Sequence, residues 1–407
     1  MLQQQQRRSR RPLIVFVVLI LLGGYAYHAL YRPLPSLNPQ QLTATLRVGS
    51  GTSRLTWPTV GQSAVAVSST NVLETHGTQS PAAIASVAKV ITALTVLQKM
   101  PLSAGETGPT YTITTADAQR YHDYVDGDGS VVPVNVGEQL TERQMLEAIM
   151  LPSANNLADT LAVWAYGSLP AYRTAATAYL GSLGLHDTTV GSDASGYSPD
   201  TMSTAHDLAL IGKAAIEHPV LRSIVGQATA EIPVAGTVNN VNFLLGTSNI
   251  IGIKTGNTDQ AGGVFLSAST TVVGGRTTTL ITALIGAPTL YQAMKYSLPL
   301  LTSAQANFNQ TTLLAKSAVV GEYRQPWGGV LSVATQSQLD ATTWRGSGTI
   351  STTIKLRPIS ADAGKGQIVG TATGPSSSLR GDGERTNLIL LDAPTAPSKL
   401  WRLLHPF

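Results

Sequence analysis

The feature that most constrains this chain stands at its N-terminus, where an apolar run of nineteen residues follows a cluster of arginines. Residues 13–31 read LIVFVVLILLGGYAYHALY, and they are preceded by Arg7, Arg8, Arg10 and Arg11. A helix of nineteen residues is roughly 28 Å long, which is close to the hydrocarbon thickness of a bilayer. Because basic residues stay on the cytoplasmic side, the pattern predicts one transmembrane helix with the rest of the chain exported.

A cleaved signal peptide is the alternative explanation of this segment. The run is long for a signal peptide, and Tyr25 and Tyr27 are bulky where a cleavage site requires small residues. We therefore expect a cytoplasmic tail over residues 1–11 and a single-pass plasma-membrane anchor over residues 12–31. The following residues, 32–44, contain prolines at intervals and predict a stiff spacer outside the cell.

Composition excludes several classes of function. The net charge is +4, and the four N-terminal arginines account for all of it (4 − 4 = 0), so the folded part offers no basic face for nucleic acid. The chain has no cysteine, which rules out thiolate catalysis, disulfides and cysteine-ligated zinc. Its seven histidines show no zinc-binding spacing. We therefore expect no metal and no cofactor.

The pattern along the chain predicts two folded domains. Helical segments at 84–97, 141–150 and 156–166 come first, and another begins at Thr204; β-rich segments follow, at 249–255, 264–273 and 277–285, with Gly274-Gly275 placed for a hairpin turn. Helices followed by an antiparallel sheet indicate an α+β domain, which we place at residues 45–305. Residues 311–407 show only short β-branched runs between turns and predict a separate all-β domain, on which Trp401 is expected to pack.

Ser86-Val87-Ala88-Lys89 lies at the start of the apolar segment 84–97. An offset of three residues places the serine and the lysine on one helix face, one turn apart. A lysine in such apolar surroundings has a lowered pKa and can accept the proton of the serine. The alternative is a chance pattern in which Lys89 only extends towards solvent.

Two further segments could carry polar groups into a cleft. Ser153-Ala154-Asn155 lies between two helices after a proline break, although Asn155 or Asn156 could simply cap the second helix. Lys254-Thr255-Gly256 ends an apolar strand, where the glycine would let a ligand lie against the backbone. An edge-strand lysine that leads into a turn is the alternative there.

The three motifs in this order resemble the signature of the penicillin-recognising serine peptidases and β-lactamases, which combines Ser-x-x-Lys, Ser-x-Asn and Lys-Thr-Gly. The chain is most similar to a D-alanyl-D-alanine carboxypeptidase, a low-molecular-mass penicillin-binding protein. The resemblance covers roughly residues 55–300. It implies a fold in which helices flank an antiparallel sheet. The all-β segment that follows is similar in place to the β-sandwich that many of these peptidases carry.

The resemblance implies a role for each residue of the first two motifs. Ser86 is the nucleophile that attacks the carbonyl between two D-alanines of a peptidoglycan stem peptide, and Lys89 is its general base. Ser153 passes a proton to the leaving D-alanine, and Asn155 holds an amide of the substrate. β-Lactams would acylate Ser86 as inhibitors.

The third motif would bind the substrate. Lys254 and Thr255 contact the terminal carboxylate, and Gly256 belongs to the same strand. The backbone N–H groups of Ser86 and Asn257 would form the oxyanion hole. Water then hydrolyses the acyl-enzyme, so that one difficult step becomes two easier ones.

The chain departs from the family pattern in two places. Asn156 stands where the family usually has aspartate. The family often has an arginine after the strands that follow Lys-Thr-Gly; residues 285–291 contain none, and Arg276 and Lys295 are the nearest cations in sequence. The second departure leaves open whether the enzyme acts as a carboxypeptidase or as an endopeptidase.

Two other functions remain as alternatives. A β-lactamase would need a deacylating glutamate between the second and third motifs, where Glu217 and Glu231 are the candidates. A non-catalytic module that binds peptidoglycan or senses β-lactams would tolerate loss of the motif residues, whereas all of them are present here.

Overall fold

The computed structural model describes residues 11–42, 45–49, 51–68, 70–374 and 384–405. Its contacts divide the chain into two units. The larger unit comprises Ser50–Asn309 and Thr342–Gly348, and the smaller comprises Met1–Gly49, Gln310–Ala341 and Thr349–Phe407.

A five-stranded antiparallel sheet forms the centre of the larger unit, in the order β11-β12-β13-β3-β4. Its strands are β3 (Gln62–Val67), β4 (Leu73–His76), β11 (Ile250–Thr258), β12 (Gly262–Val273) and β13 (Arg276–Ala287). The three β-rich segments and the hairpin at Gly274-Gly275 that the sequence predicts are confirmed. Strands β3 and β4, which come before the helices in sequence, complete the sheet beside β13.

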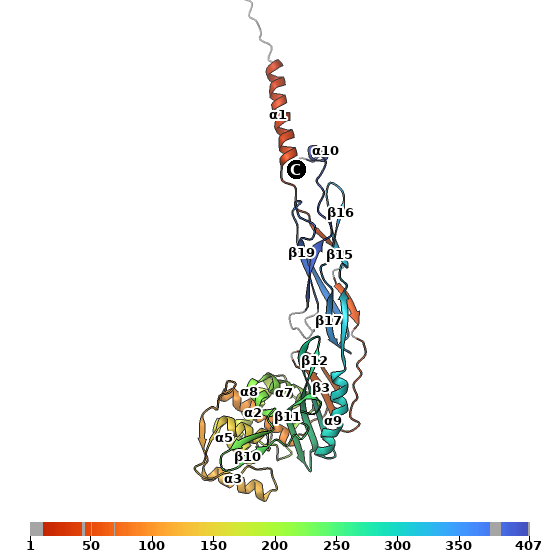
Figure 1. Ribbon diagram of the computed structural model, residues 1–407. Coiled ribbons are helices and arrows are strands. Elements are labelled where there is room, and N and C mark those ends of the chain that lie inside the picture. Colours follow the sequence, from red (N-terminus) through yellow and green to blue (C-terminus); the bar gives the residue numbers. More distant parts are fainter. Residues whose placement is uncertain (1–10, 43–44, 50, 69, 375–383, 406–407) are drawn as a thin grey trace, which may run out of the picture. The chain divides into compact units, whose positions relative to one another are not determined.

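Helices cover both faces of this sheet (Figure 1). Phe265 and Leu284 pack with α9 (Leu290–Gln305) on one face, while Leu266 and Ile281 belong to the core on the other face. Successive residues of a strand point to opposite faces, so these apolar strands are buried on both sides. On the second face α7 (Ala205–Glu217) and α8 (Pro219–Val225) contact the strands of the sheet. The other helices of this core pack on them or on one another: α2 (Ala88–Lys99), α3 (Thr115–Asp126), α4 (Glu142–Met150), α5 (Asn155–Tyr166) and α6 (Leu169–Ser182).

Short elements connect these helices and strands: η1 (Ala85–Val87), η2 (Thr247–Asn249), β5 (Ala82–Ala83), β6 (Thr110–Thr112), β7 (Gln139–Thr141), β8 (Met202–Ser203), β9 (Thr229–Ile232) and β10 (Gly236–Asn239). Two helix predictions from sequence are confirmed in detail. Residues 88–97 of α2 are all buried. Helix α4 begins at a capping box in which Thr141 and Gln144 bond to each other's backbone N–H groups.

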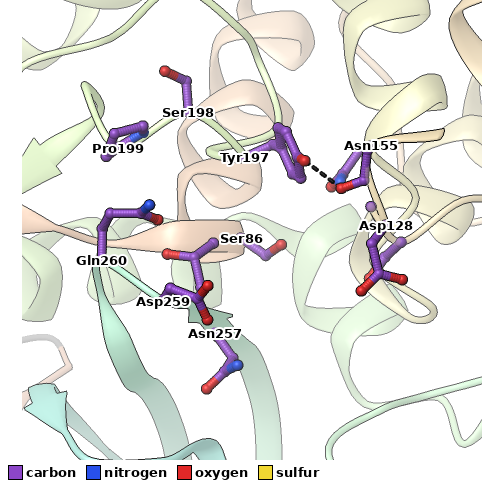
Figure 2. A pocket seen from close by; sticks show the side chains of 13 residues that line it. Ser86, Asp128, Asn155, Tyr197, Ser198, Pro199, Asn257, Asp259 and Gln260 are labelled. Carbon is purple, nitrogen blue, oxygen red and sulfur yellow. Dashed lines mark hydrogen bonds between the residues drawn. The ribbon is translucent and has the colours of Figure 1, made fainter. Parts of the chain in front are cut away.

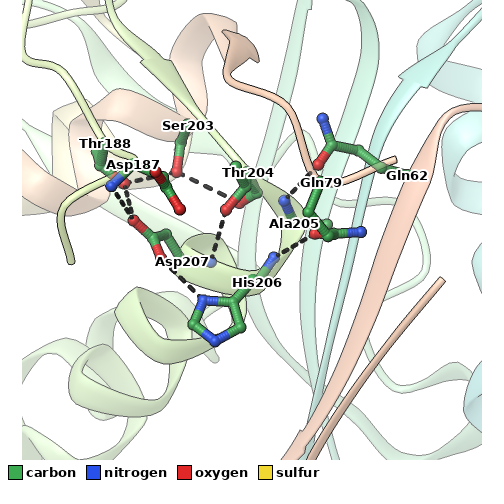
Figure 3. A network of polar contacts seen from close by, with 9 residues as sticks. All are labelled: Gln62, Gln79, Asp187, Thr188, Ser203, Thr204, Ala205, His206 and Asp207. Carbon is green, nitrogen blue, oxygen red and sulfur yellow. Dashed lines mark hydrogen bonds and ion pairs between the residues drawn. The ribbon is translucent and has the colours of Figure 1, made fainter. Parts of the chain in front are cut away.

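The start of α7 is fixed to the sheet by side chains (Figure 3). Gln62 of β3 accepts a hydrogen bond from the backbone N–H of Ala205, and Thr204 accepts one from Asp207. Gln79 accepts another from His206. The first N–H groups of a helix have no partner within it, so these bonds both cap α7 and set its position against β3.

The smaller unit contains a seven-stranded sheet in the order β1-β15-β16-β20-β19-β18-β2. A separate pair, β14 with β17, is divided between the two units. The bounds are β14 (Phe308–Leu314), β15 (Val319–Arg324), β16 (Val330–Thr335), β17 (Leu339–Trp344), β18 (Thr349–Leu356), β19 (Ile368–Thr373) and β20 (Arg385–Leu390). The predicted all-β character of this segment is confirmed.

The N-terminal part of the chain takes a different role from the one its prolines predict. β1 (Pro39–Gln41) pairs with β15, and β2 (Thr45–Gly49) pairs with β18. Residues 39–41 were expected in a spacer and residues 45–49 in the α+β domain. Both instead supply the outer strands of the C-terminal sheet, and β1 can do so because an edge strand tolerates proline at its first position.

The apolar N-terminal segment forms α1 (Arg11–Tyr31), and Leu13–Tyr31 is long and apolar enough to cross a membrane. The rest of the predicted cytoplasmic tail lies outside the described residues. The short C-terminal helix α10 (Lys399–Leu404) packs beside the end of α1, where Arg402 donates to the carbonyls of Leu30 and Arg32. Trp401 packs against Trp327 with ring centroids 5.5 Å apart, as expected.

Candidate active site

Ser86 lies in the 3-10 turn η1 immediately before α2, whereas the sequence predicts it inside the α-helix. Two glycines allow other segments to approach this turn closely. A Cβ on Gly256 would lie 2.8 Å from the Ile84 carbonyl oxygen, and one on Gly196 would lie 2.1 Å from that of Ala85. Ala85 itself has a φ of +46°, a strained conformation for a residue with a side chain. The turn that presents Ser86 is therefore held from both sides.

Lys89 extends from the first turn of α2 into a fully buried site. Its Nζ lies 2.8 Å from Ser86 Oγ, 2.7 Å from Asn155 Oδ1 and 2.9 Å from the carbonyl oxygen of Ser195. The amide and carbonyl oxygens can only accept hydrogen bonds. A neutral amine would use its two N–H groups on these oxygens and direct its lone pair at the hydroxyl of Ser86.

The electrostatic surroundings of Lys89 favour this neutral state. Burial lowers the pKa of Lys89 well below its ordinary value, and Lys254 acts in the same direction. The carboxylates of Asp193 and Asp159 raise it and so oppose part of the effect. The arrangement therefore suits an amine that takes a proton from Ser86.

The second motif lies opposite, at the start of α5. Ser153 is only 6% exposed, has a φ of +70°, and its Oγ has no hydrogen-bond partner among the described residues. Asn155 is the first residue of α5 and accepts from Lys89 through Oδ1. The alternative that Asn155 or Asn156 caps this helix is wrong: no side chain caps it, and Asn156 bonds to both backbone groups of Val132.

The third motif lies on β11, beside the turn that carries Ser86. Lys254 is 1% exposed, and its only hydrogen bond among the described residues goes to the Thr255 carbonyl oxygen at 3.2 Å. Burial lowers the pKa of Lys254 to about 7. The missing side chain of Gly256 makes room for η1, which is a constraint that the sequence did not predict. The motif thus brings a poorly paired buried amine to the site.

A cavity of about 560 Å³ is lined in part by Ser86 and Asn155 (Figure 2). Figure 2 shows Asn155 and Asp128 on one side, Asn257 and Gln260 on the other, and Ser86 between them. The full lining consists of Ser86, Gly127, Asp128, Gly129, Ser130, Asn155, Tyr197, Ser198, Pro199, Asn257, Thr258, Asp259 and Gln260. Three of the residues predicted from sequence, Ser86, Asn155 and Asn257, therefore line one cavity.

Sequence reasoning missed one whole wall of this cavity. Residues 127–130 and 197–199 lie far apart in sequence and are joined by a hydrogen bond from the Tyr197 hydroxyl to the Gly127 carbonyl. Asp128, in the acidic stretch 126–130, has a φ of +56°, a conformation found mainly in turns. Among the described residues, no three His, Cys, Asp or Glu side chains are grouped so that they could hold a metal ion. No local motif marks such loops, since only the fold brings them together.

Three charged residues that the sequence analysis considered, Arg276, Glu217 and Glu231, lie outside the cavity. Arg276 stands at the hairpin end of β13, the end opposite Ala287, and no arginine is among the residues that line the cavity in the described part of the chain. Glu231 lies on β9 and accepts from Thr237 of the neighbouring strand. Glu217, at the end of α7, accepts a hydrogen bond from Ser68. Neither glutamate lines the cavity.

Comparison with known proteins gives a consistent result. The sequence model of the D-alanyl-D-alanine carboxypeptidase family matches residues 59–289. The chain is 34% identical over 192 residues to D-alanyl-D-alanine carboxypeptidase DacB2 of Mycobacterium tuberculosis, and 33% identical over 208 residues to DacA of Escherichia coli. These matches cover 46% and 47% of this chain and 61% and 50% of the relatives. The chain therefore spans only about half to three fifths of the length of these curated relatives.

Solved structures show the same fold. Penicillin-binding protein 5 from Haemophilus influenzae matches with a TM-score of 0.58 at 20% identity, over 84% of this chain and 98% of that one. The Streptomyces K15 DD-transpeptidase matches with a TM-score of 0.53 at 25% identity, over 61% and 98%. The predicted α+β class with a C-terminal β-rich segment is thus confirmed.

Proposed function

Because this chain belongs to the family of D-alanyl-D-alanine carboxypeptidases, we propose that it removes the terminal D-alanine from peptidoglycan stem peptides through an acyl-enzyme on Ser86. The observation that carries the proposal is the set of contacts at Lys89. Two acceptor-only oxygens and the Ser86 hydroxyl surround a buried amine of lowered pKa, which is the arrangement that a general base for serine requires.

Acylation proceeds by transfer of the Ser86 proton to Lys89 while Oγ bonds to the carbonyl carbon between the two D-alanines. The C–N bond then breaks, and Ser153 delivers a proton to the departing amine. The buried and unpartnered Oγ of Ser153 supports this role. Asn155 holds a substrate amide through its NH₂ group, since its Oδ1 is already bonded to Lys89.

Two negatively charged groups must be bound during the reaction: the oxyanion and the terminal carboxylate of the substrate. The backbone N–H groups of Ser86 and Asn257 stabilise the oxyanion, and Lys254 with Thr255 binds the terminal carboxylate. The nearly partnerless amine of Lys254 supports this assignment, because a carboxylate would satisfy a cation that the protein leaves almost unpaired. With no arginine lining the cavity in the described residues, Lys254 carries this recognition.

Hydrolysis of the acyl-enzyme by water releases the shortened stem peptide and regenerates Ser86. A β-lactam would form the same ester and act as an inhibitor. The positions of Glu217 and Glu231 outside the cavity give no support to a β-lactamase with a dedicated deacylating glutamate. A free terminal carboxylate at Lys254 favours carboxypeptidase over endopeptidase action.

We place the enzyme at the outer side of the plasma membrane, held by α1 as a single-pass anchor. The apolar, almost fully exposed surface of this helix supports insertion, and arginines before it support a cytoplasmic N-terminus. Peptidoglycan stem peptides lie on that outer side, within reach of an anchored enzyme.

The test uses the chain from residue 33 onward with a labelled penicillin and, separately, a peptide ending in D-Ala-D-Ala. We expect a stable adduct on Ser86 and release of D-alanine, both abolished by Ser86→Ala. Ser198→Ala, which changes another serine of the same cavity, should still form the adduct. Rapid turnover of the penicillin would instead identify a β-lactamase, and absence of any adduct a non-catalytic module.

A further inference from the structure

The third contact of Lys89 comes from a loop to which the proposed reaction gives no role. Residues 191–200 cross over α2, and the Ser195 carbonyl accepts from Lys89 Nζ at 2.9 Å. The preceding residue, Ala194, is held at both backbone groups: Thr92 of α2 donates to its carbonyl at 2.6 Å, and its N–H donates to Asp159 Oδ1 at 2.8 Å. The position of the carbonyl on Lys89 therefore depends on Asp159.

Asp159 stands one helical turn after Asn155 on α5, so both side chains lie on the face that meets Lys89. It is 6% exposed. Its second oxygen accepts from the Tyr124 hydroxyl of α3 at 2.7 Å. A buried carboxylate with one bond to a helix and one to a loop backbone fixes that loop more firmly than a surface contact would.

A second carboxylate shapes the same loop from within. Asp193 Oδ1 accepts from the backbone N–H and hydroxyl of Ser195, each at 2.7 Å, and from Gly196 N–H at 2.6 Å. Asp193 therefore makes the turn, whereas Asp159 ties the turn to α5. Both carboxylates raise the pKa of Lys89, in opposition to its burial.

We propose that Asp159 is a positioning residue for Lys89: it holds the Ala194–Ser195 backbone against the amine and stabilises the ammonium that forms when Ser86 loses its proton. The inference rests on the proposed role of Lys89 as the base. The charged and titratable groups that face Asp159 are Tyr124 and Arg120 of α3, Asp193 of the loop, Tyr172 of α6 and Lys89 of α2.

Asp159 also connects the site to pH. Burial and the neighbouring Asp193 raise the pKa of Asp159 to about 6, while its bonds from Ala194 and Tyr124 and the charge of Arg120 act in the opposite direction. Asp159 is therefore negative above pH 6 and becomes neutral below it. Loss of that charge destabilises the ammonium of Lys89, so the two groups titrate as a coupled pair.

The experiment measures the second-order rate of acylation by a labelled penicillin between pH 5 and pH 9 in the full chain, kept in detergent. Asp159→Asn keeps the shape but removes the charge. We expect the acid limb of its profile to move to lower pH by roughly half a unit or more, and the rate at pH 8 to fall about 3- to 10-fold, because the base is weaker. Asp200→Asn removes an exposed carboxylate of the same loop and should leave the limb in place.

Asp159→Glu gives the complementary result. It keeps the charge but displaces the oxygens, so the rate should fall while the acid limb stays where it is in the unchanged protein. Three results would overturn the proposal. The acid limb could stay in place in folded Asp159→Asn, it could move equally in Asp200→Asn, or it could move in Asp159→Glu. If Asp159→Asn does not fold, the acid limb of Asp159→Glu decides: a moved limb overturns the proposal, and an unmoved limb with a lower rate supports it. Absence of acylation in the unchanged protein at every pH would refute the proposed function instead.

Discussion

At the scale of single residues, the site places two buried lysines close enough to influence each other. Lys254 lowers the pKa of Lys89, and burial lowers the pKa of both. The proposed reaction needs them in opposite states, with Lys89 neutral to accept a proton and Lys254 positive to bind a carboxylate. The charge of Lys254 favours the neutral state of Lys89, because it lowers the pKa of Lys89 beyond the effect of burial.

Burial lowers the pKa of Lys254 to about 7, and this gives a prediction about pH. Lys254 loses its positive charge as the pH rises through about 7, so kcat/KM for a peptide ending in D-Ala-D-Ala should fall above that pH. A peptide with a C-terminal amide offers no carboxylate to Lys254, and its kcat/KM should lack this basic limb. D-Alanine or D-alaninamide release from the two peptides, measured from pH 6 to pH 9, checks the difference. Identical basic limbs for both peptides would show that Lys254 does not recognise the carboxylate.

At the scale of elements, the position of the turn η1, which contains Ser86, depends on how closely β11 approaches it. Gly256 permits this approach, because a Cβ there would lie 2.8 Å from the Ile84 carbonyl oxygen and 3.2 Å from the Ser86 nitrogen. Both atoms belong to backbone and cannot swing aside as a flexible side chain could. The strand and the turn must therefore separate if a methyl group is added.

We predict that Gly256→Ala slows acylation by penicillin at least about 100-fold, since a displacement near 1 Å at a reacting group has an effect of that order. Gly181→Ala is the matched control, because its Cβ meets nothing within 4 Å and it lies in helix α6. The control should keep the acylation rate and melt at an equal or higher temperature. Equal acylation rates in the two variants would contradict the packing argument.

Sequence patterns predicted those elements whose signal is local. The burial of α2, the capping box of α4 and the hairpin at Gly274-Gly275 all follow from neighbouring residues. Strand β1 was missed, because it pairs with β15, more than a hundred residues away, and carries no turn signal towards it. Strand β3 was missed as well; it pairs with the equally distant β13, although its other neighbour β4 follows closely in sequence.

The candidate site divides in the same way. Three motifs on regular elements or at their ends predicted Ser86, Asn155 and Lys254 together, and the structure places Ser86 and Asn155 around Lys89. The loops that contain Asp128 and Ser195 carry no pattern, because their positions result from tertiary packing. In the sequence Asp159 is an ordinary polar residue of a helix, and only the structure shows that it accepts a hydrogen bond from Ala194 of the neighbouring loop.

At the scale of the whole molecule, the absence of cysteine offers a clean test of the proposed membrane topology. A single cysteine introduced in the full chain, at Ser9 or at the exposed Ser36, is the only thiol that a label can find. With a membrane-impermeant maleimide applied to intact cells, we expect Ser36→Cys to react and Ser9→Cys to react only after lysis. Labelling of Ser9→Cys in intact cells would reverse the topology, and a mature protein without its first residues would indicate a cleaved signal peptide.

The pairing of β2 with β18 also sets an order of events during synthesis. Thr45 lies in register with Thr353, and the whole larger unit is encoded between the strands that contain these two residues. A growing chain therefore exposes β2 long before its partner exists, while every strand of the five-stranded sheet is already complete. The catalytic part can fold first, and the C-terminal sheet closes only once nearly the full chain has left the ribosome. A prematurely terminated protein would thus display unpaired strand edges, which is a mark that proteolytic surveillance can recognise.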